Sequence, residues 1–212
     1  MTHVEAHALG LYVAASLALI ATPGQDMIYV MTRSVAQGRV AGLCSAVGVC
    51  LGILAHTALA ALGVGAILQA SEGLFTALKL AGAAYLAYLG VRLIFTRAVP
   101  PELAAGTKPL SAWALVGQGM LSNLTNPKIV LFFLAFLPQF VDPASGHPTR
   151  DLAMLGVLYA LLALPVKAGV GLAAGSFSAA LRRRPAILAW ANRCCGVVLV
   201  GLGVRLAFAE RP

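Results

Sequence analysis

The chain has 212 residues, 60% of them hydrophobic and 10% charged, with a mean hydropathy of +0.88. A soluble domain carries roughly a quarter charged residues, so this composition excludes a soluble protein and predicts a membrane protein. The formal net charge is +8, but the basic residues lie at the ends of apolar segments, where they set membrane topology. We therefore expect the lipid bilayer as a partner and no nucleic acid.

Six charge-poor segments follow one another along the chain, each long enough for the roughly 20 residues that a bilayer crossing needs. They cover approximately residues 9–35, 41–68, 75–95, 111–140, 152–181 and 190–208. The first is interrupted at Pro23 and the fourth at Pro127. The predicted fold class is an all-α membrane protein with six transmembrane helices, the first and the fourth of them broken.

Basic residues are concentrated after the first, third and fifth of these spans. They are Arg33, Arg39, Arg92, Arg97, Lys108, Arg182, Arg183 and Arg184. The excess of Lys and Arg in cytoplasmic loops then predicts that both termini face the outer side of the membrane. Residues 1–10 lack the Lys or Arg that opens a cleavable signal peptide, so the first span is expected to remain uncleaved.

An internal repeat is visible at the ends of the third and sixth spans. The sequence GVRLIF at residues 90–95 returns as GVRLAF at residues 203–208. We expect residues 1–212 to form one transmembrane domain with halves of approximately 1–98 and 109–212, joined by a cytoplasmic linker at 99–108. Each half has three spans, an odd number, so the halves enter the membrane from opposite sides as a 3+3 inverted repeat.

The paired breaks are the strongest indication of a substrate site. A proline within a helix removes a backbone donor, and in lipid the freed groups need partners in the protein or in a wet cavity. Paired interruptions in corresponding segments are typical of the substrate sites of secondary transporters. The predicted substrate-binding residues are Pro23, Gly24, Gln25, Asp26, Asn126, Pro127, Lys128 and Lys167.

Asp26 is the strongest candidate for a functional residue. Placing a carboxylate within a membrane span costs free energy, so such a residue is by default functional. It is expected to bind a substrate amine, to accept the coupling proton, or to do both in alternation; a pair with Arg33 is the structural alternative. Lys128 is expected to bind a substrate carboxylate, and its alternatives are to neutralise Asp26 or to reach the interface. Lys167, near the middle of the fifth span, is a further carboxylate partner.

Other polar residues in the spans receive structural interpretations. Asn123 is expected to cap freed backbone groups, and His56 to hydrogen-bond a neighbouring helix rather than relay protons. Lys79 lies close to a span end and is expected to extend towards the interface. The pairs Gly48-x-x-x-Gly52 and Gly171-x-x-x-Gly175 permit close helix packing, and leave a homodimer possible.

Two ordered motifs resemble those of the lysine exporter and homoserine/threonine resistance (LysE/RhtB) family. The first runs from Thr22 to Val30 with the sequence TPGQDMIYV; the second is Asn126-Pro127-Lys128, followed by LPQFV at residues 137–141. The resemblance implies a multi-pass protein of the bacterial inner membrane with periplasmic termini. It further implies export of an amino acid driven by the proton gradient. Many members have a proline where this chain has Gln25.

Three other classes of function are weighed against this one. A metal-cation exporter of a related family would collect several Asp, Glu, His or Cys ligands in its spans, and this chain offers Asp26 and His56 there without a cluster. A membrane thiol-disulfide electron carrier needs two facing cysteines. The chain has Cys44, Cys50, Cys194 and Cys195, none of them at a break. No nucleophile–base pair or metal motif indicates an enzyme, and no cofactor is expected.

Overall fold

The computed structural model describes residues 6–64, 72–95, 108–141, 146–183 and 185–208, and all regular structure within these ranges is helical. The elements are α1 (Ala6–Ala21), α2 (Gln25–Gln37), α3 (Arg39–Leu59), the π-helix η1 (Ala60–Val64), α5 (Glu72–Phe95), α6 (Ala112–Leu124), α7 (Pro127–Leu131), the π-helix η2 (Phe132–Phe136), the 3-10 helix η3 (Leu137–Phe140), α8 (Pro148–Arg183) and α9 (Pro185–Phe208). The predicted linker at 99–108 lies outside the described residues except for Lys108.

Both predicted breaks are present. The first separates α1 from α2, which are bent by 49° relative to each other. The second separates α6 from the segment Pro127–Phe140, with a bend of 54°. Pro165 behaves differently, because it lies inside the 36-residue helix α8 without ending it.

By length and composition, two described helical stretches could each cross a membrane, Arg39–Gly63 and Pro148–Ala174. Counting each bent pair as one span raises the number to four. The helices α5 and α9 are not among these, although their 24 residues each correspond to about 36 Å of helix. The expectation of six spans is therefore confirmed only in part.

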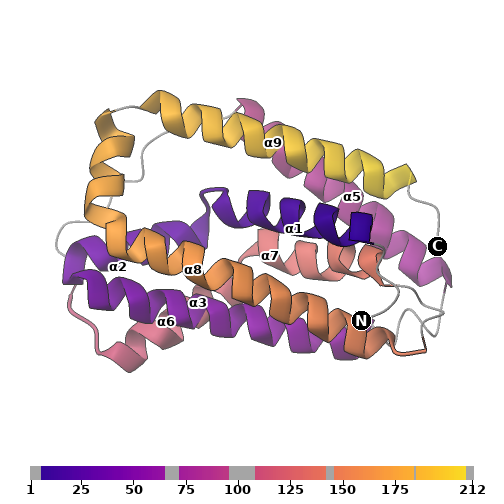
Figure 1. The fold of residues 1–212 in the computed structure, drawn as a ribbon, viewed down its shortest axis with the longest axis horizontal. Helices are drawn as coiled ribbons and strands as arrows, with labels where there is room; N and C mark the ends of the chain where they lie inside the picture. Colours follow the sequence, from indigo (N-terminus) through magenta and orange to yellow (C-terminus); the bar gives the residue numbers. More distant parts are fainter. Residues whose placement is uncertain (1–5, 65–71, 96–107, 142–145, 184, 209–212) are drawn as a thin grey trace.

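The helices form a bundle in which α5 packs along α9, and α3 packs along both α6 and α8. In Figure 1, α1 and α7 run through the middle of the bundle, between the α5–α9 pair and α3. Glycines permit these close approaches. A Cβ on Gly90 would meet the backbone oxygen of Gly196, and one on Gly42 would lie 3.0 Å from Cα of Gly171.

The small-xxx-small pairs expected to permit close packing are used within the chain. A Cβ on Gly48 would collide with the backbone of Val116, and one on Gly52 would lie 2.7 Å from Cβ of Asn123. The faces that carry Gly48, Gly52 and Gly171 therefore pack against helices of the same chain. A homodimer would need another surface.

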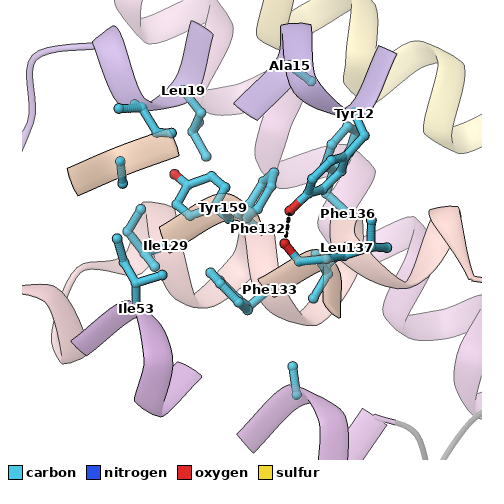
Figure 2. Packing of buried hydrophobic residues seen from close by; sticks show 14 of the residues in the cluster. Tyr12, Ala15, Leu19, Ile53, Ile129, Phe132, Phe133, Phe136, Leu137 and Tyr159 are labelled. Atoms are coloured by element: carbon cyan, nitrogen blue, oxygen red, sulfur yellow. Dashed lines mark hydrogen bonds between the residues drawn. The ribbon is translucent and has the colours of Figure 1, made fainter. Parts of the chain in front are cut away.

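A cluster of aromatic side chains fills the core on one side of the breaks (Figure 2). This aromatic cluster consists of Tyr12, Phe132, Phe133, Phe136, Phe140 and Tyr159. The ring centroids of Phe132 and Tyr159 are 4.7 Å apart, and the hydroxyl of Tyr12 donates to the carbonyl of Leu155 at 2.7 Å. Offset aromatic contacts of this kind join α1, η2 and α8 tightly.

Candidate functional site

The first break leaves backbone carbonyls that the helix itself cannot satisfy. Pro23 has no N–H, so the carbonyl of Leu19, four residues earlier, has no helical partner. The side chain of Lys128 reaches it from the second break: its Nζ donates to Leu19 at 3.1 Å and to the carbonyl of Thr22 at 3.2 Å. Gly24 leaves room for this ammonium group, because a Cβ there would lie 3.2 Å from Nζ.

A second lysine approaches the same helix end from α8. Lys167 is only 4% exposed, and its Nζ lies 3.5 Å from the carbonyl of Ile20. The carboxyl end of a helix carries a partial negative charge. The two ammonium groups of Lys128 and Lys167 therefore complement the end of α1, and among the described residues both keep donors beyond these contacts.

At the second break, neutral groups hydrogen-bond the freed backbone groups. Asn126 caps α7, its Oδ1 accepting from the backbone N–H of Lys128 at 3.1 Å. Pro127 removes the donor that would have served the carbonyl of Asn123. That carbonyl accepts from the N–H of Asn126 at 3.0 Å, and Nε2 of His56 lies 3.3 Å from it.

Asp26, which follows the first break, contacts Asn123, which precedes the second. It lies in the first turn of α2, where the helix end favours a negative charge, and it is 3% exposed. The amide Nδ2 of Asn123 donates to its Oδ2 at 2.8 Å. Neither Asp26 Oδ1, Asn123 Oδ1 nor Asn126 Nδ2 has a hydrogen-bond partner in the described part of the protein. Buried polar atoms nearly always find a partner, so these three are candidate contacts for a water molecule or a ligand.

The predicted site residues thus lie in two groups at the breaks, with Lys128 and Lys167 at the end of α1 and Asp26 bonded to Asn123. The alternative in which Asp26 pairs with Arg33 is wrong, because the guanidinium of Arg33 donates instead to Gln118 Oε1 at 3.0 Å and to the carbonyl of Lys108 at 3.4 Å. Gln25 is exposed, and its amide donates to Thr125 Oγ1 at 3.2 Å. This contact connects the breaks at the surface.

Asn123 has a larger role than its sequence suggested. The sequence indicated a structural cap. In the structure Asn123 is fully buried, and its side-chain amide hydrogen-bonds the Asp26 carboxylate. The sequence could have indicated this role. Asn123 stands four residues before Pro127, so its backbone carbonyl is the one that loses a hydrogen-bond donor to this proline. The interpretation of His56 as a hydrogen-bonding residue is confirmed by its contact with that carbonyl.

Metal and thiol chemistry gain no support from the geometry. Within the described ranges, no group of three or more His, Cys, Asp or Glu side chains is placed to hold a metal ion. The four cysteines are free thiols. The Sγ of Cys195 lies 3.5 Å from the carbonyl of Ala18, so its neighbour is backbone.

Comparisons with known proteins show which family the chain resembles over most of its length. A family model described as LysE type translocator matches residues 17–210. An uncharacterized membrane protein of Pseudomonas aeruginosa is 36% identical over 93% of this chain and 94% of its own length. One from Vibrio cholerae is 30% identical over 98% and 100%. A leucine efflux protein of Salmonella typhimurium is 25% identical over 92% of both chains. No solved structure matches.

Proposed function

The chain belongs to the LysE type translocator family, and on that premise we propose that it exports an amino acid or a close derivative across the bacterial inner membrane in exchange for protons. Family membership makes it a membrane transporter and not an enzyme. The relatives called leucine efflux proteins make leucine the first substrate to test. The contact that carries the proposal is the one between Lys128 and the carbonyls freed at Pro23.

That contact supports coupling between the two breaks. Lys128 begins the helix after the second break but bonds the end of the helix before the first. A ligand that binds its ammonium group weakens the hold on Leu19 and Thr22, and so changes the stability of the bent conformation at Pro23. Substrate binding at one break thereby affects the other, which is what alternating access requires.

We propose that the amine and the carboxylate of the amino acid bind at Asp26 and at Lys128, respectively. The substrate amine pairs with Oδ1 of Asp26, the oxygen with no partner in the described residues. The substrate carboxylate pairs with Lys128 and with the amino end of α2, where Gly24 provides no side-chain cap. Lys167, whose Nζ lies at the carboxyl end of α1 beside the same break, adds a second cation. Asp26 also takes up the coupling proton when the amine leaves.

We also propose the six-span topology, with halves of approximately 1–98 and 109–212 and both termini in the periplasm. Under an inverted repeat, α3 is equivalent to α8 and α5 to α9, and each of these pairs packs face to face. The beginning of α1 and the end of α9 lie towards the same end of the bundle (Figure 1). A phosphatase fused after Pro212 should be active and one fused at Arg183 inactive; the reverse would overturn this topology.

Metabolite profiling of the medium from cells that overproduce the protein tests the function. We expect one or a few amino acids to accumulate outside wild-type cells, and none beyond background with Asp26→Asn. Asp151→Asn is the matched control, since it makes the same chemical change in the first turn of α8, away from both breaks. Equal export by wild type and Asp26→Asn, both present in the membrane, would contradict the proposed role of Asp26.

A further inference from the structure

A groove of about 880 Å³ runs between α2 and α6, outside the site formed by the two breaks. Most of the residues that line it carry a polar group, although the surface that they expose there is largely apolar. The lining residues are Gln25, Ile28, Tyr29, Thr32, Arg33, Gln118, Leu121, Ser122 and Thr125. The groove begins at the contact between Gln25 and Thr125, which are the neighbours in sequence of Asp26 and Asn126.

Both walls of the groove present a polar stripe at helical spacing. On α2 the stripe is Gln25, Tyr29 and Thr32; on α6 and its cap it is Gln118, Ser122 and Thr125. Spacings of four and three residues place these side chains on one face of each helix. In the hydrocarbon region polar groups need partners inside the protein or water in a cavity. The two stripes bond each other at Gln25–Thr125 and at Arg33–Gln118. Ser122 Oγ has no partner among the described residues, so the facing stripes offer polar contacts to water or to a polar ligand.

Arg33 stands at the other end of this groove. Among the described residues, two of its five N–H donors are used, towards Gln118 Oε1 and the carbonyl of Lys108. Its guanidinium also lies 5.8 Å from the centre of the Tyr29 ring, within the range of a cation–π contact. An arginine held in this way with donors to spare is suited to binding a carboxylate.

On the other side of the breaks, the packed aromatic cluster leaves no path for a small molecule among the described residues. There the aromatic cluster is buried, with Tyr12 fully inaccessible and Phe132 2% exposed. A small molecule therefore has room to approach the breaks along the α2–α6 groove and not through the aromatic cluster. The open side is the one where α2 ends and α6 begins, near Lys108.

We propose that this groove is the loading vestibule of the transporter, in which Arg33 binds the carboxylate of an amino acid arriving from the cytoplasm before it passes Gln25 and Thr125 to reach Asp26. The inference rests on the proposed function and topology. It adds a second binding site, specific for a carboxylate, to the site at the breaks. Gln118 acts as a positioning residue by holding the guanidinium.

Water access to the groove is tested by cysteine labelling, which needs no transport. The four native cysteines are first replaced, and Ile28→Cys is compared with Leu54→Cys. The two positions are matched, since Ile28 is 42% exposed in the groove and Leu54 is 40% exposed on α3 outside it. With a charged, membrane-impermeant maleimide on everted vesicles, we expect Ile28→Cys to react about tenfold faster, because the reactive thiolate forms in water.

Equal rates at the two positions, or labelling of Ile28→Cys only from the periplasmic side, would overturn the vestibule. Labelling that appears only after detergent has removed the lipid would mean that a lipid chain fills the groove, and would overturn it as well. Because the assay does not measure export, its failure is distinguishable from failure of the proposed function, in which no amino acid leaves the cells.

Carboxylate binding is tested by protection of the same cysteine. An equimolar mixture of amino acids should slow the labelling of Ile28→Cys, whereas a mixture of the corresponding amino-acid amides should not, because the amides lack the carboxylate. Adding Arg33→Gln should abolish the protection, and Arg33→Lys should retain part of it. Protection by both mixtures, protection by neither, or protection that survives Arg33→Gln would show that Arg33 binds no carboxylate.

Discussion

The break at Pro23 and the break at Pro127 leave the same kind of gap in a helix, but different partners fill the two gaps. At Pro23 the freed carbonyl of Leu19 is bonded by Lys128, an ammonium group 109 positions away in the sequence. At Pro127 the freed carbonyl of Asn123 is bonded by the N–H of Asn126, three residues away, with His56 at 3.3 Å. One break is held by a distant charge and the other mainly by local neutral groups.

The difference indicates which break moves. A carboxylate competes with a backbone carbonyl for an ammonium group, so the contact between Lys128 and Leu19 responds to an anionic ligand. An amide cap of the kind that Asn126 provides does not change charge, so binding of a proton or an ion does not act on it directly. We expect the first break to be the mobile one and the second to act as its support.

Combining Asp26→Asn with Lys128→Ala should have the largest effect. Asp26→Asn should abolish proton-coupled export, and Lys128→Ala should strongly reduce export of zwitterions. Lys128→Ala also leaves the Leu19 carbonyl without its partner, at a cost of about 1–3 kcal/mol if the carbonyl stays buried. If the residues share a site, the double variant should lose little beyond the worse single variant, because neighbours in one network are not additive.

Export assays on the two single variants and the double variant check this, with thermal unfolding in detergent as the control for folding. Fully additive losses, with both single variants still exporting well, would show that the two charges have structural roles at separate places.

Replacing each proline should have the next largest effect and should separate the breaks. Pro23→Ala supplies the missing N–H to Leu19 and so competes with Lys128. We expect reduced export together with unchanged or increased thermal stability. Pro127→Ala should change export less, because the Asn123 carbonyl already has the N–H of Asn126. Equal losses from the two substitutions, measured as initial export rates per amount of protein, would contradict a mobile first break.

His56→Ala should have a smaller effect on the second break. The substitution removes the ring nitrogen near the Asn123 carbonyl and a stacked contact with Phe133, whose ring centre is 5.8 Å away. The carbonyl keeps its backbone bond, so we expect a stability loss on the order of 1 kcal/mol and retained export. His56→Gln is the control that keeps a hydrogen-bonding side chain. Complete loss of export with both variants well folded would give His56 a part in proton transfer.

Replacing all four cysteines by Ala or Ser should have the smallest effect. They are free thiols in the structure, and neither break depends on them. We expect export by the cysteine-free protein to match wild type. A cysteine-free variant that reaches the membrane but exports nothing would revive the thiol-disulfide alternative.

Much of the fold followed from local rules. The apolar lengths predicted helices, and the two prolines predicted breaks that the structure contains at 49° and 54°. Pro165 shows the limit of that rule, since the same residue type lies within the unbroken helix α8. The family was recognisable from the motifs at Thr22–Val30 and Asn126–Lys128. Asn123 was underestimated, because its partner Asp26 lies 97 positions away.

The sequence by itself determined where backbone donors are lost, because a proline removes its own N–H and frees a carbonyl four residues earlier whatever the rest of the chain does. It also determined that several charges stand in apolar spans, at a cost that needs an explanation. Only the tertiary structure decided which groups meet. Lys128 and Lys167 come to the end of α1, and Asn123 comes to Asp26, through helix packing that joins residues 97 to 147 positions apart. Such contacts depend on the relative placement of whole helices, which short-range sequence patterns do not encode.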